Sequence, residues 1–202
     1  SVKAVVVACN TATAHALAVL EVELPVPVIG VVGPGARAAV RAAAAGAIGV
    51  IGTAGTVRSG AYERAIAEIA PHASVTARAC PLLVPFVEEG WTDHPATRLV
   101  TEEYLAPFRD DGVDTLVLGC THYPLLRGVI GDVVGPAIRL IDSAHETAAE
   151  IGAVLATRGI AAPAGRSGSA HYVVSDAAEQ FARTARHFLG APLHHVETIT
   201  LG

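Results

Sequence analysis

The sequence has few of the residues and patterns that mark several common classes of protein. Its 202 residues include no methionine, three cysteines and 4% aromatic residues. No long uncharged apolar run is present, so we expect no membrane-spanning segment. The 14 lysines and arginines form no cluster and the formal net charge is −5, which together argue against nucleic-acid binding. The cysteines are far apart and form no Cys-x-x-Cys pair, which argues against a disulfide framework and favours a reducing, cytoplasmic environment.

The first residues are typical of a strand followed by a helix, and not of a signal peptide. Cys9, Asn10 and Thr11 interrupt the first apolar run, and two glutamates follow. The chain opens at Ser1, directly before a predicted buried strand. Two interpretations of this start remain open, namely removal of an initiator methionine or a fragment of a longer protein.

Short apolar runs alternate with longer helical stretches along the chain. Hydrophobic residues make up 51% and charged residues 16%, which is enough for a sizeable core. The alternation predicts an α/β fold with mostly parallel sheets flanked by helices. The predicted strands lie near 3–8, 27–32, 47–52, 74–79, 114–118, 138–142, 171–175 and 195–200. The predicted helices lie near 13–23, 35–45, 57–70, 94–109, 123–134, 144–158 and 176–189.

Two junctions divide this pattern. The glycines and proline of Gly33–Gly35 predict a turn. Asp142 and Ser143 form the second junction, where Ser143 is predicted to cap the helix that follows.

Two cysteine-containing turns share one construction. An apolar run precedes Cys9 and another precedes Cys120, and helical sequence follows each turn. Open α/β folds place their chemistry at the carboxyl ends of strands, so we expect both thiols there, each at the amino end of a helix. Two matched thiols suggest a single reaction that needs an acid and a base of the same kind.

A free cysteine is more often a small buried hydrophobe than a reactive group. The matched settings of Cys9 and Cys120 favour function, because the positive end of a helix dipole stabilises a thiolate. Cys80 stands in Ala79–Leu83 without a polar neighbour, and we interpret it as structural.

Short polar side chains follow each of the two matched cysteines. Asn10 and Thr11 follow Cys9, and Thr121 and His122 follow Cys120. These side chains are suited both to cap a helix and to bind a carboxylate together with backbone N–H groups; the two roles are compatible, and the sequence does not separate them. His122 is either a surface histidine or a protonated group that lowers the pKa of the Cys120 thiol.

Two other patterns are weaker. Gly52–Val57 is similar to an anion-binding turn, but it lacks the lysine of a P-loop and the spacing of a dinucleotide-binding motif. A metal site is an alternative use of Cys120 with His122, or of His194 with His195. These spacings match no standard zinc pattern, so we expect no metal.

Taken together, the motifs resemble glutamate racemase, a cofactor-independent family of the aspartate/glutamate racemase superfamily. The resemblance rests first on Val6–Ala12 and Leu118–Leu126, which contain the two matched cysteines. Ile51–Tyr62, Ala79–Pro85 and Leu140–Ala144 add to it, so it extends over nearly the whole chain.

The resemblance implies two pseudo-symmetric α/β lobes with the active site in the cleft between them. The first lobe would comprise 1–33 and 143–202, and the second 34–142. Cys9 and Cys120 would stand on opposite faces of the substrate α-carbon and exchange the roles of base and acid with the direction of the reaction.

The resemblance also implies the remaining site residues, the substrate and the assembly. His122 would be a catalytic residue beside the two cysteines. The substrate-binding residues would be Asn10, Thr11, Thr53, Thr56, Thr121 and His122. The enzyme would be a cytoplasmic homodimer that uses no cofactor and supplies D-glutamate for peptidoglycan.

One departure from the family pattern gives a further expectation. Members carry an additional N-terminal segment with an Asp-Ser motif and a Pro-Tyr-Gly loop, both of which contribute to substrate binding. No such motif precedes Cys9, so we expect a chain shortened at its N-terminus that has weak or no activity alone. The alternatives are an aspartate or related racemase, a non-catalytic binding domain, and a metalloprotein that uses Cys120 and His122.

Overall fold

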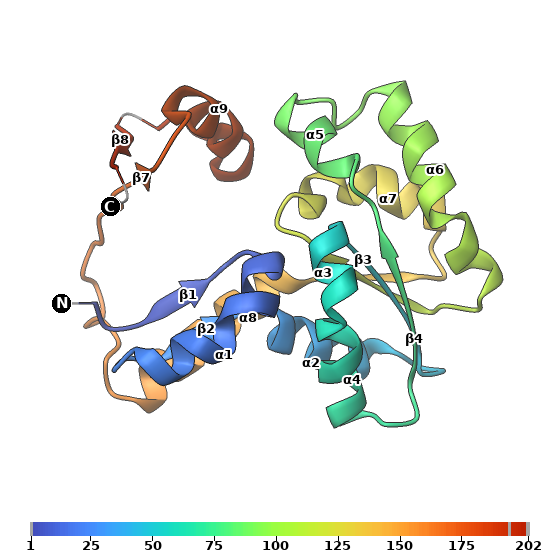
Figure 1. Ribbon diagram of the computed structural model, residues 1–202, viewed down its shortest axis with the longest axis horizontal. Coiled ribbons are helices and arrows are strands. Elements are labelled where there is room, and N and C mark those ends of the chain that lie inside the picture. Colours follow the sequence, from blue (N-terminus) through green and yellow to red (C-terminus); the bar gives the residue numbers. More distant parts are fainter. Residues whose placement is uncertain (1, 194, 201–202) are drawn as a thin grey trace.

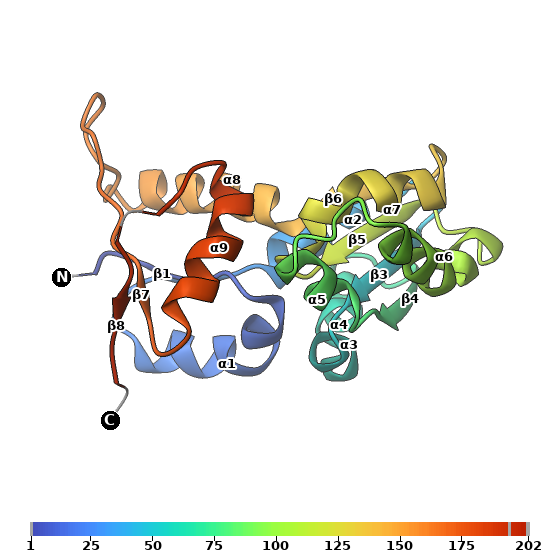
Figure 2. The ribbon, with the colours of Figure 1, turned by 90° about the horizontal axis from the view of Figure 1, so that it is seen from above.

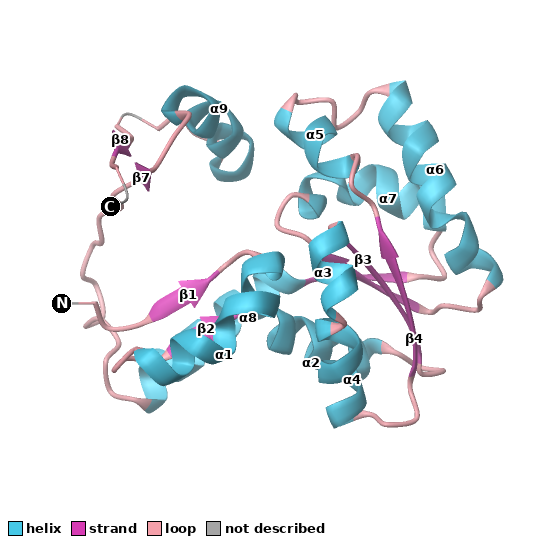
Figure 3. Ribbon diagram, viewed as in Figure 1, coloured by secondary structure: helices cyan, strands magenta, loops and turns pink. Residues whose placement is uncertain are grey.

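The computed structural model describes residues 2–193 and 195–200 and contains three parallel sheets flanked by helices (Figures 1 and 3). The strands are β1 (Val5–Val7), β2 (Val28–Gly30), β3 (Ala47–Gly52), β4 (Ser74–Ala79), β5 (Thr115–Gly119), β6 (Arg139–Asp142), β7 (Val173–Val174) and β8 (Glu197–Thr198). The helices are α1 (Asn10–Glu23), α2 (Val32–Ala42), α3 (Ala54–Ser59), α4 (Ala61–Ile69), α5 (Leu83–Glu88), α6 (Pro95–Asp110), the 3-10 helix η1 (Tyr123–Leu126), α7 (Arg127–Val134), α8 (Ser143–Thr157) and α9 (Ala178–Leu189). The predicted fold class is confirmed. No helix among the described residues is long and apolar enough to cross a membrane.

The largest sheet has the strand order β4-β3-β5-β6, and all its strands are parallel. Side chains alternate between its two faces along β5. Leu116 and Leu118 pack into a core formed with α5, α6 and α7, whereas Val117 packs with residues of α2 and α4. Every residue of β5 is buried, as expected for a central parallel strand with helices on both faces.

The strands β1 and β2 form a separate two-stranded sheet, which is far less enclosed. Val6, in the middle of β1, is 39% exposed. Helix α1 is held to this sheet by Thr13, whose hydroxyl donates to the carbonyl of Val7 at 2.8 Å and accepts from the N–H of Val31 at 3.3 Å. Gly30 lets α1 approach closely, because an added Cβ would lie 2.5 Å from the Cγ2 atom of Thr13.

Helix α2 packs against α4 and β5 and also against α8. Arg41 and Glu146 form an ion pair between α2 and α8 at 2.8 Å, and Arg37 and Glu150 form a second one. After α8 the chain returns through β7, α9 and β8, which lie at the same end of the molecule as β1 and α1 (Figure 2).

The predicted turn at Gly33–Gly35 is wrong, because these residues lie in α2. Pro34 is accepted there because the first N–H groups of a helix have no acceptor within the helix. Gly35 is needed for close packing, since an added Cβ would lie 3.0 Å from the hydroxyl oxygen of Tyr62 and 3.1 Å from the Cβ of Ser143.

The helix that follows the second junction begins differently from the prediction. Ser143 is the first residue of α8, and Asp142 is the N-cap, with its Oδ1 accepting from the N–H of Ala144 at 2.9 Å.

Two predicted helices are also interrupted. The one over 57–70 breaks at Gly60, which has a φ of +64°, and the one over 123–134 starts as η1 before it becomes α7.

Candidate active site

Cys9 lies between the end of β1 and the start of α1. It is the N-cap residue of α1, with extended backbone angles, and its carbonyl accepts from the N–H of Thr13 at 2.8 Å. Its side chain makes no capping hydrogen bond, and the residue is exposed. The thiol is therefore accessible at the positive end of the α1 dipole.

Cys120 follows β5 and is buried, with an exposure of 6%. The prediction that a regular helix begins directly after it needs correction, because the 3-10 helix η1 comes first. The glycine before it is required, since a Cβ on Gly119 would lie 2.7 Å from the carbonyl oxygen of Ile51. This close approach of β5 and β3 sets the position from which the Cys120 side chain leaves the sheet.

The two thiols line a single cavity of about 120 Å³. Its lining comes from the β1–α1 turn, the start of α3, α5 and the β5–η1 turn. The lining residues are Cys9, Asn10, Thr11, Thr53, Val84, Gly119, Cys120, Thr121 and His122. All the predicted site residues except Thr56 therefore meet at one place.

Burial raises the pKa of the Cys120 thiol to about 11. The backbone N–H of His122 and the hydroxyl of Thr121 oppose this rise, whereas the negative charge of a Cys9 thiolate adds to it. The net shift is upward because burial outweighs the lowering contribution of His122, whose ring Nδ1 lies 3.9 Å from the Cys120 sulfur. Cys120 is a protonated thiol at neutral pH and is suited to donate a proton.

Three threonine hydroxyls form a cluster beside the cavity. Thr11 Oγ1 lies 2.8 Å from Thr53 Oγ1 and 3.0 Å from Thr56 Oγ1, and the last two are 3.1 Å apart. Thr53 is the N-cap of α3 and accepts from the N–H of Thr56 at 3.2 Å, so its capping role is real. Thr56 is buried and does not line the cavity, but its hydroxyl is within hydrogen-bond distance of the two that do.

Asn10 is also buried, and its carboxamide is only half paired. Its Oδ1 accepts a hydrogen bond from the hydroxyl of Tyr62 at 2.7 Å. Its Nδ2 has no hydrogen-bond partner among the described residues. A buried amide donor of this kind is available to a ligand that carries an oxygen acceptor.

The structure adds Glu88, which the sequence analysis missed. Its Oε1 lies 3.3 Å from Nε2 of His122, while the ring of Phe188 meets the His122 ring edge-on at a centroid distance of 5.7 Å. Glu88 ends α5, a helix that was not predicted, so no sequence signal indicated the pair. A carboxylate on the far nitrogen fixes the orientation of the ring.

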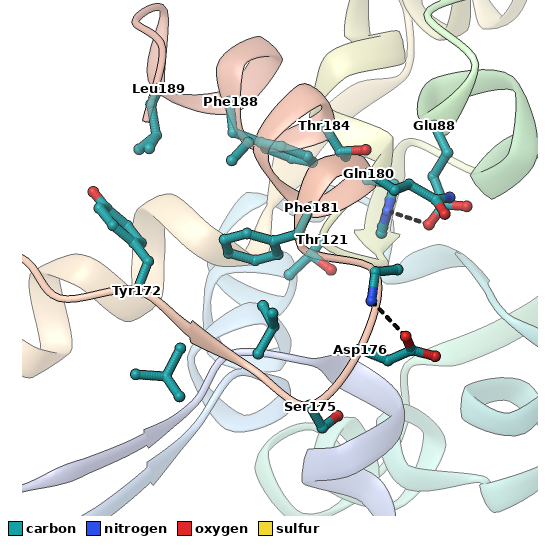
Figure 4. A pocket seen from close by; sticks show the side chains of 15 residues that line it. Glu88, Thr121, Tyr172, Ser175, Asp176, Gln180, Phe181, Thr184, Phe188 and Leu189 are labelled. Atoms are coloured by element: carbon teal, nitrogen blue, oxygen red, sulfur yellow. Dashed lines mark hydrogen bonds and ion pairs between the residues drawn. The ribbon is translucent and has the colours of Figure 1, made fainter. Parts of the chain in front are cut away.

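A larger pocket of about 790 Å³ lies next to the thiol cavity and shares Thr121 and His122 with it. Aromatic side chains of the C-terminal segment line it, among them Tyr172, Phe181 and Phe188, and Glu88 stands at its edge (Figure 4). It contains neither thiol, so the smaller cavity is the candidate for chemistry.

The remaining sequence hypotheses concern Cys80 and a metal. Cys80 is fully buried in the core with α5, and burial raises the pKa of its thiol to about 12, which fits a structural residue. Within 2–193 and 195–200 no group of three or more His, Cys, Asp or Glu side chains is arranged to hold a metal ion. His194, one of the alternative ligands, lies outside the described residues.

Residues 1–151 match the family model described as Asp/Glu/Hydantoin racemase, and the chain belongs to that family. Over 200 residues it is 49% identical to a glutamate racemase of Geobacter metallireducens, with 99% of this chain and 74% of the relative covered. The structure of glutamate racemase isoform RacE1 from Bacillus anthracis superposes with a TM-score of 0.94 at 40% identity, covering 99% of this chain and 74% of that one. The glutamate racemase of Francisella tularensis, in complex with D-glutamate, gives a TM-score of 0.90 at 30% identity, covering 98% and 74%.

These similarities extend over nearly the whole chain and place it, within the family, among the glutamate racemases, which are isomerases acting on a small molecule.

Proposed function

We propose that this protein interconverts L-glutamate and D-glutamate without a cofactor, using Cys9 and Cys120 as the two proton-transfer groups. The observation that supports this most strongly is that both thiols, distant in sequence, line one small cavity. The relative crystallised with D-glutamate supports the choice of substrate.

The reaction needs one thiolate and one thiol on opposite faces of the α-carbon. The thiolate takes the α-proton and becomes a thiol, and the electron pair of the broken C–H bond remains on the substrate as a carbanion. The opposing thiol then gives its proton to the other face and becomes the thiolate. Cys120, whose pKa burial raises to about 11, starts as the acid when Cys9 is the base, and the roles reverse in the other direction.

The cavity must lower the free energy of this carbanion, because the α-proton of an amino acid is a very weak acid. Preorganised donors and exclusion of water are the available means. The Asn10 carboxamide and the threonine cluster of Thr11, Thr53 and Thr56 provide donors. The amino ends of α1 and α3 add backbone N–H groups that favour a carboxylate.

His122 completes the proposed site. Held between Cys120 and Glu88, it would stabilise the negative charge on the Cys120 sulfur when that thiol has given up its proton. Together with Thr121 it also separates the thiol cavity from the larger aromatic pocket.

We further propose two lobes, 1–33 with 143–202 and 34–142, with the site between them. The sheet of β1 and β2 lies in the first range and the four-stranded sheet lies in the second, which supports this division. We also propose a cytoplasmic homodimer that supplies D-glutamate for peptidoglycan, in keeping with a racemase of glutamate.

Exchange of the α-proton in deuterated water tests the proposal. The protein is incubated separately with L-glutamate, D-glutamate, L-aspartate and D-aspartate, and solvent deuterium at the α-carbon and optical rotation are followed. We expect exchange and loss of rotation with both glutamates and much slower reaction with the aspartates. If exchange is faster with aspartate than with glutamate, aspartate is the substrate. If none of the four amino acids exchanges its α-proton, the proposed racemase activity is refuted.

A further inference from the structure

The carboxamide oxygen of Asn10 has a hydrogen-bond partner, whereas its nitrogen has none among the described residues. Its oxygen accepts from the Tyr62 hydroxyl at 2.7 Å, whereas its nitrogen is buried without a partner among the described residues. Asn10 follows Cys9 directly and lines the cavity of the two thiols. Because the hydroxyl engages the oxygen, the group left for a ligand is the nitrogen, a hydrogen-bond donor.

Tyr62 is tightly packed where it makes this contact. It comes from α4, is 1% exposed and belongs to the core beside β5. Glycines face it from two sides, since a Cβ on Gly35 would lie 3.0 Å from its hydroxyl oxygen and one on Gly119 would lie 3.1 Å from its ring. The ring therefore has little freedom to move, and the hydroxyl position is fixed by the fold.

The hydroxyl also stays protonated. Burial raises the pKa of Tyr62 well above its ordinary value, although the side chain of Ser143 opposes the shift. Over the whole physiological range the phenol thus keeps the proton that it donates to the Asn10 oxygen. Without this contact the carboxamide could turn over and direct its oxygen toward the anionic substrate.

We propose that Tyr62 is a positioning residue of the racemase, whose hydroxyl fixes the Asn10 carboxamide so that its N–H group is presented to the substrate carboxylate. This inference rests on the proposed function, because it takes the ligand of the cavity to be an amino acid anion. Tyr62 does not itself touch the substrate, and it acts through Asn10 alone.

The test compares Tyr62→Phe with a matched control, Tyr123→Phe. Both variants remove one hydroxyl from a fully buried tyrosine. The Tyr123 hydroxyl donates at 2.8 Å to the carbonyl of Cys80, and among the described residues no hydrogen bond joins it to a side chain of the cavity. We expect Tyr62→Phe to lower kcat/KM for glutamate by about tenfold or more, and Tyr123→Phe by less than about threefold, at similar losses of thermal stability. Equal losses of activity would overturn the proposal.

A double variant separates positioning from general destabilisation. If Tyr62 acts through Asn10, then Tyr62→Phe has no further effect on kcat/KM once Asn10→Ala is present. If instead the double variant loses kcat/KM by the product of the two single losses, Tyr62 acts by another route and the inference is refuted.

A measurement without turnover keeps this inference distinct from the proposed function. The side-chain amide signal of Asn10 in a ¹⁵N–¹H NMR spectrum is identified by its loss in Asn10→Ala. We expect it to shift in Tyr62→Phe and to stay in place in Tyr123→Phe, even if the protein proves inactive on glutamate. An unchanged Asn10 signal in Tyr62→Phe would reject the positioning role, whereas failure of wild-type exchange alone would reject the glutamate assignment.

Discussion

The two cysteine turns have the same local construction but very different surroundings. Cys9 follows a three-residue strand of a two-stranded sheet and is exposed, whereas Cys120 follows the fully buried central strand of a four-stranded sheet. The short motif determines that a thiol leaves the end of a strand. The depth of the surrounding core determines how easily that thiol ionises, as the raised pKa of Cys120 shows.

The largest expected effect is equal on both sides of this comparison. We expect Cys9→Ala and Cys120→Ala each to reduce racemisation by at least about 10³-fold, because each removes one of the two proposed proton-transfer groups. Interconversion is measured from both glutamate enantiomers by loss of optical rotation. Cys80→Ala is the control and should keep turnover within about threefold, since Cys80 lies in the core. Either alanine variant with full turnover in both directions would end the two-base interpretation.

The surroundings of the two thiols should differ in their contribution to stability. Leu118, in β5, is fully buried, whereas Val6, in β1, is 39% exposed. We expect Leu118→Ala to lower the free energy of unfolding by about 2–5 kcal/mol and Val6→Ala by less than about 1 kcal/mol. Urea denaturation followed by circular dichroism gives both values. Similar losses would show that the β1 sheet is as well packed as the larger one.

The thiols should also react at different rates with iodoacetamide. Cys9 is exposed, while Cys120 is buried with a pKa of about 11, so at pH 7.5 we expect Cys120 to react on the order of a hundredfold more slowly. Its rate should rise by about tenfold for each pH unit below that pKa, because only the thiolate reacts. Peptide mapping by mass spectrometry follows each site separately. Preferential labelling of Cys120 at pH 7.5 would contradict the assigned burial.

The high pKa also predicts a dependence of stability on pH. A thiol whose pKa is about 11 in the folded state and near its ordinary value in the unfolded state holds its proton longer when folded. The unfolded state therefore binds fewer protons between about pH 9 and pH 11, and the free energy of unfolding falls as the pH rises through this range. Cys120→Ser should flatten part of this fall in a series of urea titrations. An unchanged slope would show that other groups dominate.

The smallest expected effect concerns Glu88, whose carboxylate lies next to His122 on the Cys120 side of the cavity. Glu88→Gln removes the negative charge next to His122, and because the pair is partly exposed we expect kcat/KM to fall by only about three- to tenfold. Glu89→Gln, its neighbour at the end of α5, is the control and should have no effect. Equal activity of the two variants would remove Glu88 from the site.

The sequence predicted the parts of the fold that depend on local pattern. Apolar runs identify β3 and β5 closely, because buried parallel strands are continuously hydrophobic. Helix α5 was missed because Pro81 and Pro85 argue against a helix, yet a proline in the first turn loses no hydrogen bond.

In the candidate site, too, local pattern predicts some features and the folded chain alone reveals others. The cysteines and their polar neighbours stand in recognisable motifs, so the sequence alone singled them out as candidates, and the fold brings all of the candidates except Thr56 to one cavity. The contacts of Tyr62 with Asn10 and of Glu88 with His122 join segments that only the folded chain brings together, and no local sequence pattern predicts them. Likewise, a motif carries no measure of burial, and the direction of the Cys120 pKa could not be read from it.

The left-handed backbone of Gly60 ends α3 and turns the chain directly into α4. One side of this bend carries Thr56 of the hydroxyl cluster, and the other side carries Tyr62. A side chain at position 60 would strain the bend whatever space surrounds it. Such a substitution is expected to displace both Thr56 and Tyr62, so Gly60 sets the relative placement of two groups that support the proposed site.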